Sequence, residues 1–307
     1  MSEAGREPLV CGFLNVLKPP GMTSAQVVGF VRRLMCGGKV GHAGTLDPEA
    51  AGVLPLMAGK AARLFDYLQD KEKAYVAEVA FGCATDTQDA QGIPLERSGN
   101  CPTEQAIRDA LPGFAGTIWQ RPPMFSAIKQ DGKRLYALAR EGKQAEVPKR
   151  QVTVHGLSLL GTTERYGALL SVQCSKGFYV RTLCHDLGQA LGCPAHMRFL
   201  LRTRSGVFTL ETAKTLESLE AAARQGKLED MLLPPEVALG HLHHVQVPQR
   251  FYAAFSHGGR LPWREFPSLQ GTPAEQGKPF GLWWGGKLAA VGERQGDEVK
   301  LRTWLAD

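Results

Sequence analysis

The sequence contains no apolar run that approaches the about 20 residues a helix needs to cross a bilayer, so a membrane-spanning helix is excluded. The first ten residues carry Glu3, Arg6 and Glu7 and no apolar stretch, so we expect no secretory signal peptide there. The seven cysteines are odd in number and scattered, and no two form a Cys-x-x-Cys pair. This spacing argues against a disulfide framework and a structural zinc site, and favours reduced thiols in a cytoplasmic protein.

Two kinds of cofactor site are also missing from the sequence. No Gly-x-x-x-x-Gly-Lys-Ser/Thr loop is present to cradle the phosphates of a nucleotide. The histidines gather only at His241, His243 and His244, without an adjacent acid or cysteine to complete a set of metal ligands, so we interpret them as surface residues. The sequence therefore shows neither a nucleotide phosphate loop nor a clear set of metal ligands.

Composition places the chain among soluble globular proteins of more than one domain. It has 307 residues, of which 43% are hydrophobic and 21% charged. The formal net charge of +6 and the isoelectric point near 8.9 suggest a polyanionic partner. Residues 119–150 hold eight basic residues against three acidic ones, and Arg198, Arg202 and Arg204 follow with no acid among them. Both groups suit either phosphate contacts or a solvated basic face.

Apolar periodicity alternates between helix-like and strand-like stretches, which predicts both kinds of element. Thr23 or Ser24 is placed to cap a first helix that ends near Gly37. Further helices are predicted at 61–69, 103–111, 180–191 and 213–225, a helical turn at 135–140, and strands at 73–82, 151–160 and 168–174. From about residue 243, short strand-like runs alternate with Gly and Pro, so we place a domain boundary near residue 240.

The most informative stretch is the loop at residues 41–48, which holds a single carboxylate, Asp47, between apolar segments. Gly41 and Gly44 permit backbone angles and close approaches that a side chain would block. Pro48 disfavours the helical conformation for the residue before it, so Asp47 should be extended and restricted. Local physics leaves two interpretations of Asp47: a turn-capping residue or a preorganised reactive group.

Residues 42–48 resemble the catalytic loop of the B-type tRNA pseudouridine synthases, and three further segments resemble that family in the same order. Residues 15–24 resemble its opening segment, residues 73–75 its tyrosine strand, and residues 177–183 its arginine motif. Four ordered matches over some two hundred residues are far more specific than any one of them.

The resemblance implies an α+β fold with a mixed, largely antiparallel sheet flanked by helices. Residues 1–240 would form the catalytic domain, with a basic RNA-gripping insertion at 121–150, and residues 241–307 a small PUA-like β-rich RNA-binding domain. The implied reaction isomerises the T-loop uridine of tRNA, position 55 in the usual tRNA numbering, to pseudouridine. It breaks the C1′–N1 bond, rotates the base and joins C1′ to C5. The implied enzyme is a cytoplasmic monomer that binds the T arm of tRNA and needs no cofactor or protein partner.

The same resemblance assigns catalytic roles to Asp47, Tyr75 and Arg181. Asp47 would be the catalytic carboxylate, which attacks the ribose C1′, attacks the uracil ring or removes a proton from C2′. All three paths require an ionised carboxylate in a dry pocket, where burial alone raises its pKa. Arg181 would be its counter-ion. The ring of Tyr75 would pack against the uracil.

Further residues would bind the substrate. Lys18 would support the Asp47 loop electrostatically or hold a backbone carbonyl near Pro19. His42 would fill the place left by the everted base. Tyr179 lies in the arginine motif, and Leu200 aligns with an apolar contact to the base. The implied RNA contacts are Lys129, Lys133, Arg134 and Arg202, while Leu201 stands where a second arginine is expected.

Three other functions fit the same residues. A guide-RNA-dependent relative would carry a similar loop but would not modify bare tRNA. A tRNA-binding folding chaperone would keep its role without Asp47. A hydrolase acting through one aspartate would release free uracil.

Overall fold

The computed structural model describes residues 11–68, 72–125, 147–164, 166–266 and 277–305, and the backbone alone at 129–130 and 133–134. Within these ranges, no helix is long and apolar enough to cross a membrane. The short strands β8 (Lys129–Gln130) and β9 (Lys133–Arg134) pair with each other. The helical turn predicted at 135–140 lies outside the described residues.

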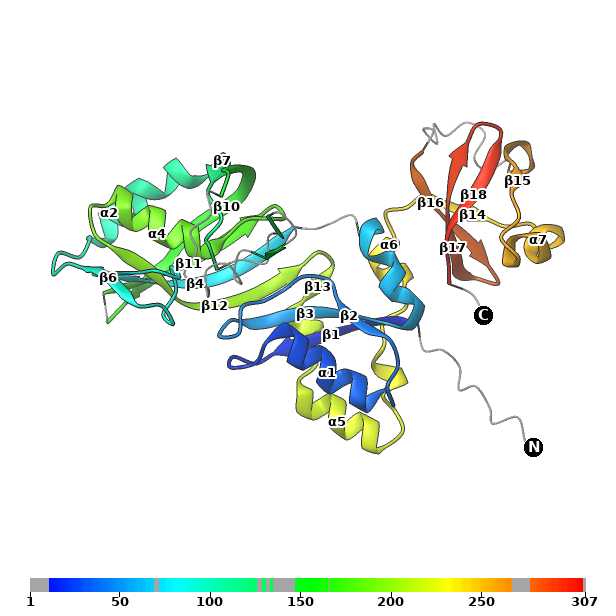
Figure 1. Ribbon diagram of the computed structural model, residues 1–307, viewed down its shortest axis with the longest axis horizontal. Coiled ribbons are helices and arrows are strands. Elements are labelled where there is room, and N and C mark those ends of the chain that lie inside the picture. The colour runs from blue at the N-terminus through cyan, green and yellow to red at the C-terminus, as the bar shows by residue number, and fades with distance from the viewer. Residues whose placement is uncertain are drawn as a thin grey trace.

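A nine-stranded sheet forms the larger part of the molecule (Figure 1), with seven strands in the order β1-β3-β12-β4-β11-β10-β7. The β3–β12 pair is parallel and the other pairs are antiparallel, while β2 joins β3 and β13 joins β12. This confirms the predicted α+β fold with a mixed, largely antiparallel sheet. The strands are β1 (Gly12–Lys18), β2 (Val40–His42), β3 (Ala51–Ala58), β4 (Lys73–Phe81), β7 (Gly116–Gln120), β10 (Arg150–Thr163), β11 (Gly167–Cys174), β12 (Ala195–Ser205) and β13 (Phe208–Thr209).

The helices beside this sheet follow local sequence signals. At the start of α1, Thr23 accepts a hydrogen bond from the Gln26 backbone, and the Gln26 side chain accepts one from the Thr23 backbone, a capping box. Figure 1 shows α1 and α5 side by side next to β1, with α4 near β4 and β12. The helices are α1 (Ser24–Leu34), α2 (Glu104–Ala110), α4 (Val180–Ala190) and α5 (Leu216–Arg224). The helix predicted at 61–69 is a 3₁₀ helix, η1 (Gly59–Tyr67).

The strand predicted at 73–82 is confirmed as β4, in the middle of the sheet. Its residues Tyr75, Ala77 and Val79 are buried and alternate with partly exposed positions, as the period of two predicts. On the neighbouring strand β12, Leu200 pairs with Ala77 and Arg202 with Tyr75. The central strands therefore bring residues near 75 and near 200 together at one place in the sheet.

The sequence pattern does not predict β12, because its arginines resemble a surface cluster. In the structure Arg198 forms an ion pair with Glu78 at 2.7 Å, and Arg204 with Glu72 at 3.5 Å. The acids come from β4 and the segment before it, so no acid appears near these arginines in the sequence. Arg198 and Arg204 therefore have acidic partners that the sequence left distant, and phosphate contact by either of them stays a prediction.

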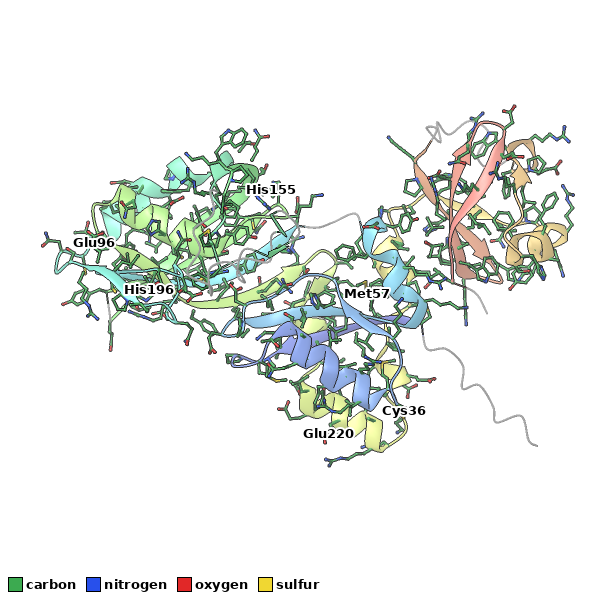
Figure 2. All side chains as sticks on the ribbon, in the orientation of Figure 1. Cys36, Met57, Glu96, His155, His196 and Glu220 are labelled. Atoms are coloured by element: carbon green, nitrogen blue, oxygen red, sulfur yellow. The ribbon has the colours of Figure 1, made fainter. Side chains whose placement is uncertain are left out.

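A five-stranded sheet follows α6 (Glu236–Leu239), with the order β14-β16-β17-β18-β15 and its own buried residues such as Val245, Phe280 and Val299. Figure 1 shows it beside the larger sheet, together with α7 (Tyr252–Ser256). A further buried cluster joins the two parts, since Met57 of β3, labelled in Figure 2, belongs to it together with Leu288. The strands are β14 (His244–Gln246), β15 (Leu261–Pro262), β16 (Pro279–Trp284), β17 (Lys287–Gln295) and β18 (Glu298–Trp304). A separate pair, β5 (Cys83–Thr85) and β6 (Pro94–Arg97), flanks the polar turn at 85–92.

Candidate active site

The loop that carries Asp47 connects β2 to β3 and is held by buried side chains. Ser24, the first residue of α1, accepts a hydrogen bond from the Leu46 amide at 2.9 Å and donates one to the Leu46 carbonyl at 3.0 Å. Gly52, at the start of β3, has a φ of +114°, and a Cβ there would lie 2.2 Å from the Arg202 carbonyl oxygen. The close parallel approach of β3 to β12 therefore requires glycine.

Lys18, at the end of β1, is fully buried and donates three hydrogen bonds to backbone carbonyls: Pro19 at 2.7 Å, Pro48 at 2.8 Å and Ala50 at 2.7 Å. Burial lowers the pKa of Lys18 to about 8, and the charges of Glu49 and Asp47 oppose this shift. The assignment of Lys18 as a substrate-binding residue is corrected, since its ammonium is enclosed and its donors are used. Lys18 instead positions the Asp47 loop, which is the supporting role that the sequence analysis also gives it.

Replacing Lys18 with methionine should lower the free energy of unfolding by at least about 3 kcal/mol, because three buried carbonyls lose their donor. Thermal and urea unfolding measure this change. Lys227→Met, at an exposed position, is the matched control and should cost less than about 0.5 kcal/mol. Equal stability of the two variants would contradict the positioning role of Lys18.

Asp47 and Arg181 form a two-point ion pair. Arg181 Nε lies 3.1 Å from Asp47 Oδ2, and Arg181 Nη2 donates to Oδ1 at 3.3 Å. Arg181, in the first turn of α4, is buried and also donates to the Phe125 carbonyl at 2.9 Å. The Asp47 side chain keeps 37% of its surface exposed. The carboxylate is therefore fixed from one side by a guanidinium and open to a substrate on the other.

Asp89 is a second carboxylate of this site that the sequence did not reveal. Arg181 Nη1 lies 3.4 Å from Asp89 Oδ2. Asp89 Oδ1 accepts hydrogen bonds from the Thr87 hydroxyl at 2.6 Å and the Gln91 amide at 3.1 Å. In the sequence Asp89 belongs to an ordinary polar turn, and only the fold brings that turn against Arg181. One arginine thus links two carboxylates.

The environment of Asp47 sets the charge of its carboxyl group. Burial raises the pKa of Asp47 above its ordinary value, and the negative charge of Asp89 raises it further. The positive charges of Arg181, Lys18 and Arg202 oppose this and favour the ionised form. Asp47 therefore depends on its cationic neighbours to be charged in a partly dry site.

Tyr75 on β4 and Leu200 on the neighbouring strand β12 are both buried. Burial raises the pKa of Tyr75 to about 12, and the Asp47 charge adds to the shift. The phenol is therefore protonated at neutral pH. The structure brings together the predicted residues Asp47, Arg181 and Tyr75, with Leu200 one strand away from Tyr75.

His42 is the last residue of β2, just before the Asp47 loop, and Tyr179 directly precedes α4. His42 is half-buried, its Nδ1 has no hydrogen-bond partner among the described residues, and burial together with the Arg202 charge lowers its pKa. The imidazole is therefore neutral near pH 7. Tyr179 is held through its backbone, whose amide donates to Gln120 Oε1 at 3.0 Å and whose carbonyl accepts from Gln120 Nε2 at 3.2 Å.

The four predicted RNA contacts have different outcomes. Arg202 is corrected: its side chain is fully buried and donates to the carbonyls of Val53 at 2.7 Å, Thr45 at 3.2 Å and Gly44 at 3.2 Å, so a phosphate cannot reach it. The side chains of the other three, Lys129, Lys133 and Arg134, lie outside the described residues and stay predictions.

A cavity of about 640 Å³ adjoins the loop at Ala43 and Gly44. Its walls are largely apolar, with Phe65 and Val237 among them, and Lys73 contributes an amine. The described residues that line it do not include Asp47 or Tyr75. This cavity is therefore a neighbour of the carboxylate site rather than the site itself.

The family model described as TruB family pseudouridylate synthase (N terminal domain) matches residues 32–180, and the one described as tRNA pseudouridylate synthase B C-terminal domain matches residues 181–240. The tRNA pseudouridine synthase B of Moorella thermoacetica is 48% identical over 85% of this chain and 88% of its own. That of Symbiobacterium thermophilum is 50% identical over 84% of each chain.

Two solved structures are also similar to this chain. A chain of the crystal structure of a Cbf5-Nop10-Gar1 complex has a TM-score of 0.71 and 28% identity, over 97% of this chain and 85% of that one. A chain of an H/ACA RNP bound to a substrate RNA containing 2′-deoxyuridine has a TM-score of 0.70 and 25% identity, over 100% and 93% respectively. The sequence identity to these two is well below that to the bacterial proteins.

Proposed function

The chain belongs to the TruB family of pseudouridylate synthases, which isomerise uridine in tRNA to pseudouridine, and on that premise we propose that Asp47 acts on the T-loop uridine at position 55. The observation that carries this proposal is the partly exposed Asp47 carboxylate held at two points by buried Arg181. A group fixed in this way needs no reorganisation when the substrate arrives.

The reaction rearranges one nucleoside without adding or removing heavy atoms. The C1′–N1 bond breaks, the uracil turns, C1′ joins C5, the C5 hydrogen leaves as a proton and N1 gains one. The uridine must first leave its stack, which costs a few kcal/mol and favours an unpaired loop over a duplex. Attack on C1′, attack on the ring and removal of the C2′ proton all use the same ionised carboxylate.

In this proposal, four other residues of the site contact the substrate. Tyr75, whose phenol is protonated, packs its ring against the everted uracil, and Leu200 supplies an apolar contact next to it. His42 is neutral in the free protein, so it fills the space left in the RNA stack without adding a charge there. Tyr179, fixed through its backbone by Gln120, contacts the substrate from the start of α4.

Two parts of the chain hold the RNA in this proposal. Residues 121–150 form the basic insertion, with Lys129, Lys133 and Arg134 as phosphate contacts, and residues 241–307 form the RNA-binding domain. Phosphate contacts make affinity fall as salt rises. The enzyme works as a monomer in the cytoplasm on the T arm of tRNA, with no protein partner.

The direct test incubates the purified chain with an unmodified tRNA transcript and no additive, then maps pseudouridine by carbodiimide primer extension. One new stop, one nucleotide 3′ of position 55, is expected, with no free uracil on chromatography. Free uracil would show a hydrolase instead. An unchanged tRNA would favour the guide-RNA-dependent alternative, for which the similarity to the Cbf5 complex is the relevant observation.

A further inference from the structure

Arg202 is a fully buried cation for which the proposed chemistry has no use. Its side chain starts on β12 and ends beneath the Asp47 loop. There its guanidinium donates to the carbonyls of Gly44 and Thr45, two and three residues before Asp47, and to Val53 on β3. Burial alone disfavours such a charge, so its retention requires partners that compensate.

Arg202 also lies next to a second predicted residue of the site. Tyr75 is its cross-strand partner on β4, both side chains are buried, and the Arg202 charge opposes the rise in the pKa of the Tyr75 phenol. One buried arginine therefore binds the Asp47 loop through its guanidinium and lies directly across the sheet from Tyr75. A lysine ammonium, a point donor on a flexible stem, lacks the fixed fork with which Arg202 donates to the carbonyls of Gly44, Thr45 and Val53.

Two other side chains, Lys18 and Ser24, support different parts of the Asp47 loop. Lys18 binds the carbonyls of Pro48 and Ala50, after Asp47, and Ser24 binds Leu46. Among these three supports, Arg202 is the one that is also the cross-strand partner of Tyr75, a residue predicted to touch the base.

We propose that Arg202 is a positioning residue for pseudouridine formation, which sets the Asp47 loop and the Tyr75 ring in one arrangement around the everted base. This inference rests on the proposed function. Arg202 touches neither RNA nor the reacting atoms, so it acts on the chemical step and leaves tRNA affinity unchanged. Misplacing a reacting group by about 1 Å can cost about 10²-fold in rate.

The test compares Arg202→Met and Arg202→Lys with the wild type and with Arg198→Met, a matched control on the same strand whose arginine pairs with Glu78. Single-turnover rates at saturating tRNA and filter-binding affinities are measured well below each melting temperature. Both Arg202 variants should lose about 10²-fold in rate with affinity within about twofold. Arg198→Met should keep the wild-type rate.

Two further readouts separate positioning from a merely structural role. The rate loss caused by Tyr75→Phe should be smaller in an Arg202→Lys background than in the wild type, because the two residues act together. The acid limb of the pH–rate profile should move to higher pH in Arg202→Met and keep its wild-type position in Arg202→Lys. The reason is that the Arg202 charge favours ionised Asp47, while Arg181 on α4, Lys18 on β1 and Asp89 are unchanged.

Folded Arg202 variants with wild-type rates, or a loss seen only in tRNA affinity, would overturn the inference. If Arg202→Met does not fold, the double-mutant cycle of Arg202→Lys and Tyr75→Phe tests the inference by itself. Additive rate losses in that cycle would overturn the inference. The wild type in the same assay tests the proposed function separately, since its own failure to form pseudouridine would refute that function before any variant is compared.

Discussion

Asp47→Asn should lower the rate of pseudouridine formation by at least about 10⁴-fold while tRNA affinity changes less than about twofold. Asparagine has nearly the shape of aspartate, and its amide oxygen can still accept a hydrogen bond from Arg181. It has no negative charge, however, and all three chemical paths require one. Single-turnover carbodiimide mapping gives the rate, and filter binding gives the affinity.

Asp230→Asn is the matched control, since Asp230 is exposed and far from the site in sequence, and it should behave as the wild type. A rate for Asp47→Asn within tenfold of wild type would refute the catalytic role of Asp47. The same variant tests the chaperone alternative, because a protein whose role is to fold tRNA keeps that role when modification is lost.

Arg181→Met should lower the rate by about 10²- to 10³-fold and move the acid limb of its pH profile upward. The sign follows from the charges. Asp47 must be ionised, burial and Asp89 already raise its pKa, and the Arg181 charge opposes them. Removing that charge raises the pKa further, so activity is lost at a higher pH as the solution is acidified.

The rate of Arg181→Lys should lie between those of the wild type and Arg181→Met. One ammonium keeps the charge but cannot bind Asp47 at two points and Asp89 as well. Single-turnover rates from about pH 5 to 9 measure both variants. Arg224→Met removes an exposed pair with Glu220 and is the control, expected to leave rate and profile unchanged. An acid limb that stays in place in Arg181→Met would show that Arg181 does not set the charge of Asp47.

Local signals in the sequence predicted much of the framework. The capping residues before α1, the alternation of β4 and the apolar face of α4 depend on neighbouring residues, and all three elements form where predicted. Glycine and proline mark the Asp47 loop as a distinctive turn, but only the family resemblance distinguishes a reactive carboxylate there from a turn-capping one. Arg181 was placed at its helix start by the same kind of reasoning.

The supports of the site could not be predicted, because each depends on contacts between distant residues. Arg202 looks like a phosphate ligand in the sequence, and only the packing of β12 against β3 and β4 encloses it. Asp89 looks like a turn residue until α4 brings Arg181 against it. Lys18 follows an apolar strand, and its enclosure depends on the loop thirty residues later.

The most direct measurement of the central claim is tritium release from bare tRNA labelled at C5 of uridine, with wild type and Asp47→Asn compared in single turnover. Joining C1′ to C5 must expel the C5 hydrogen, so the wild type should release the label of one uridine per tRNA without free uracil. Asp47→Asn should bind the same tRNA and release none at the same times. Release at the wild-type rate from the asparagine variant would contradict the account.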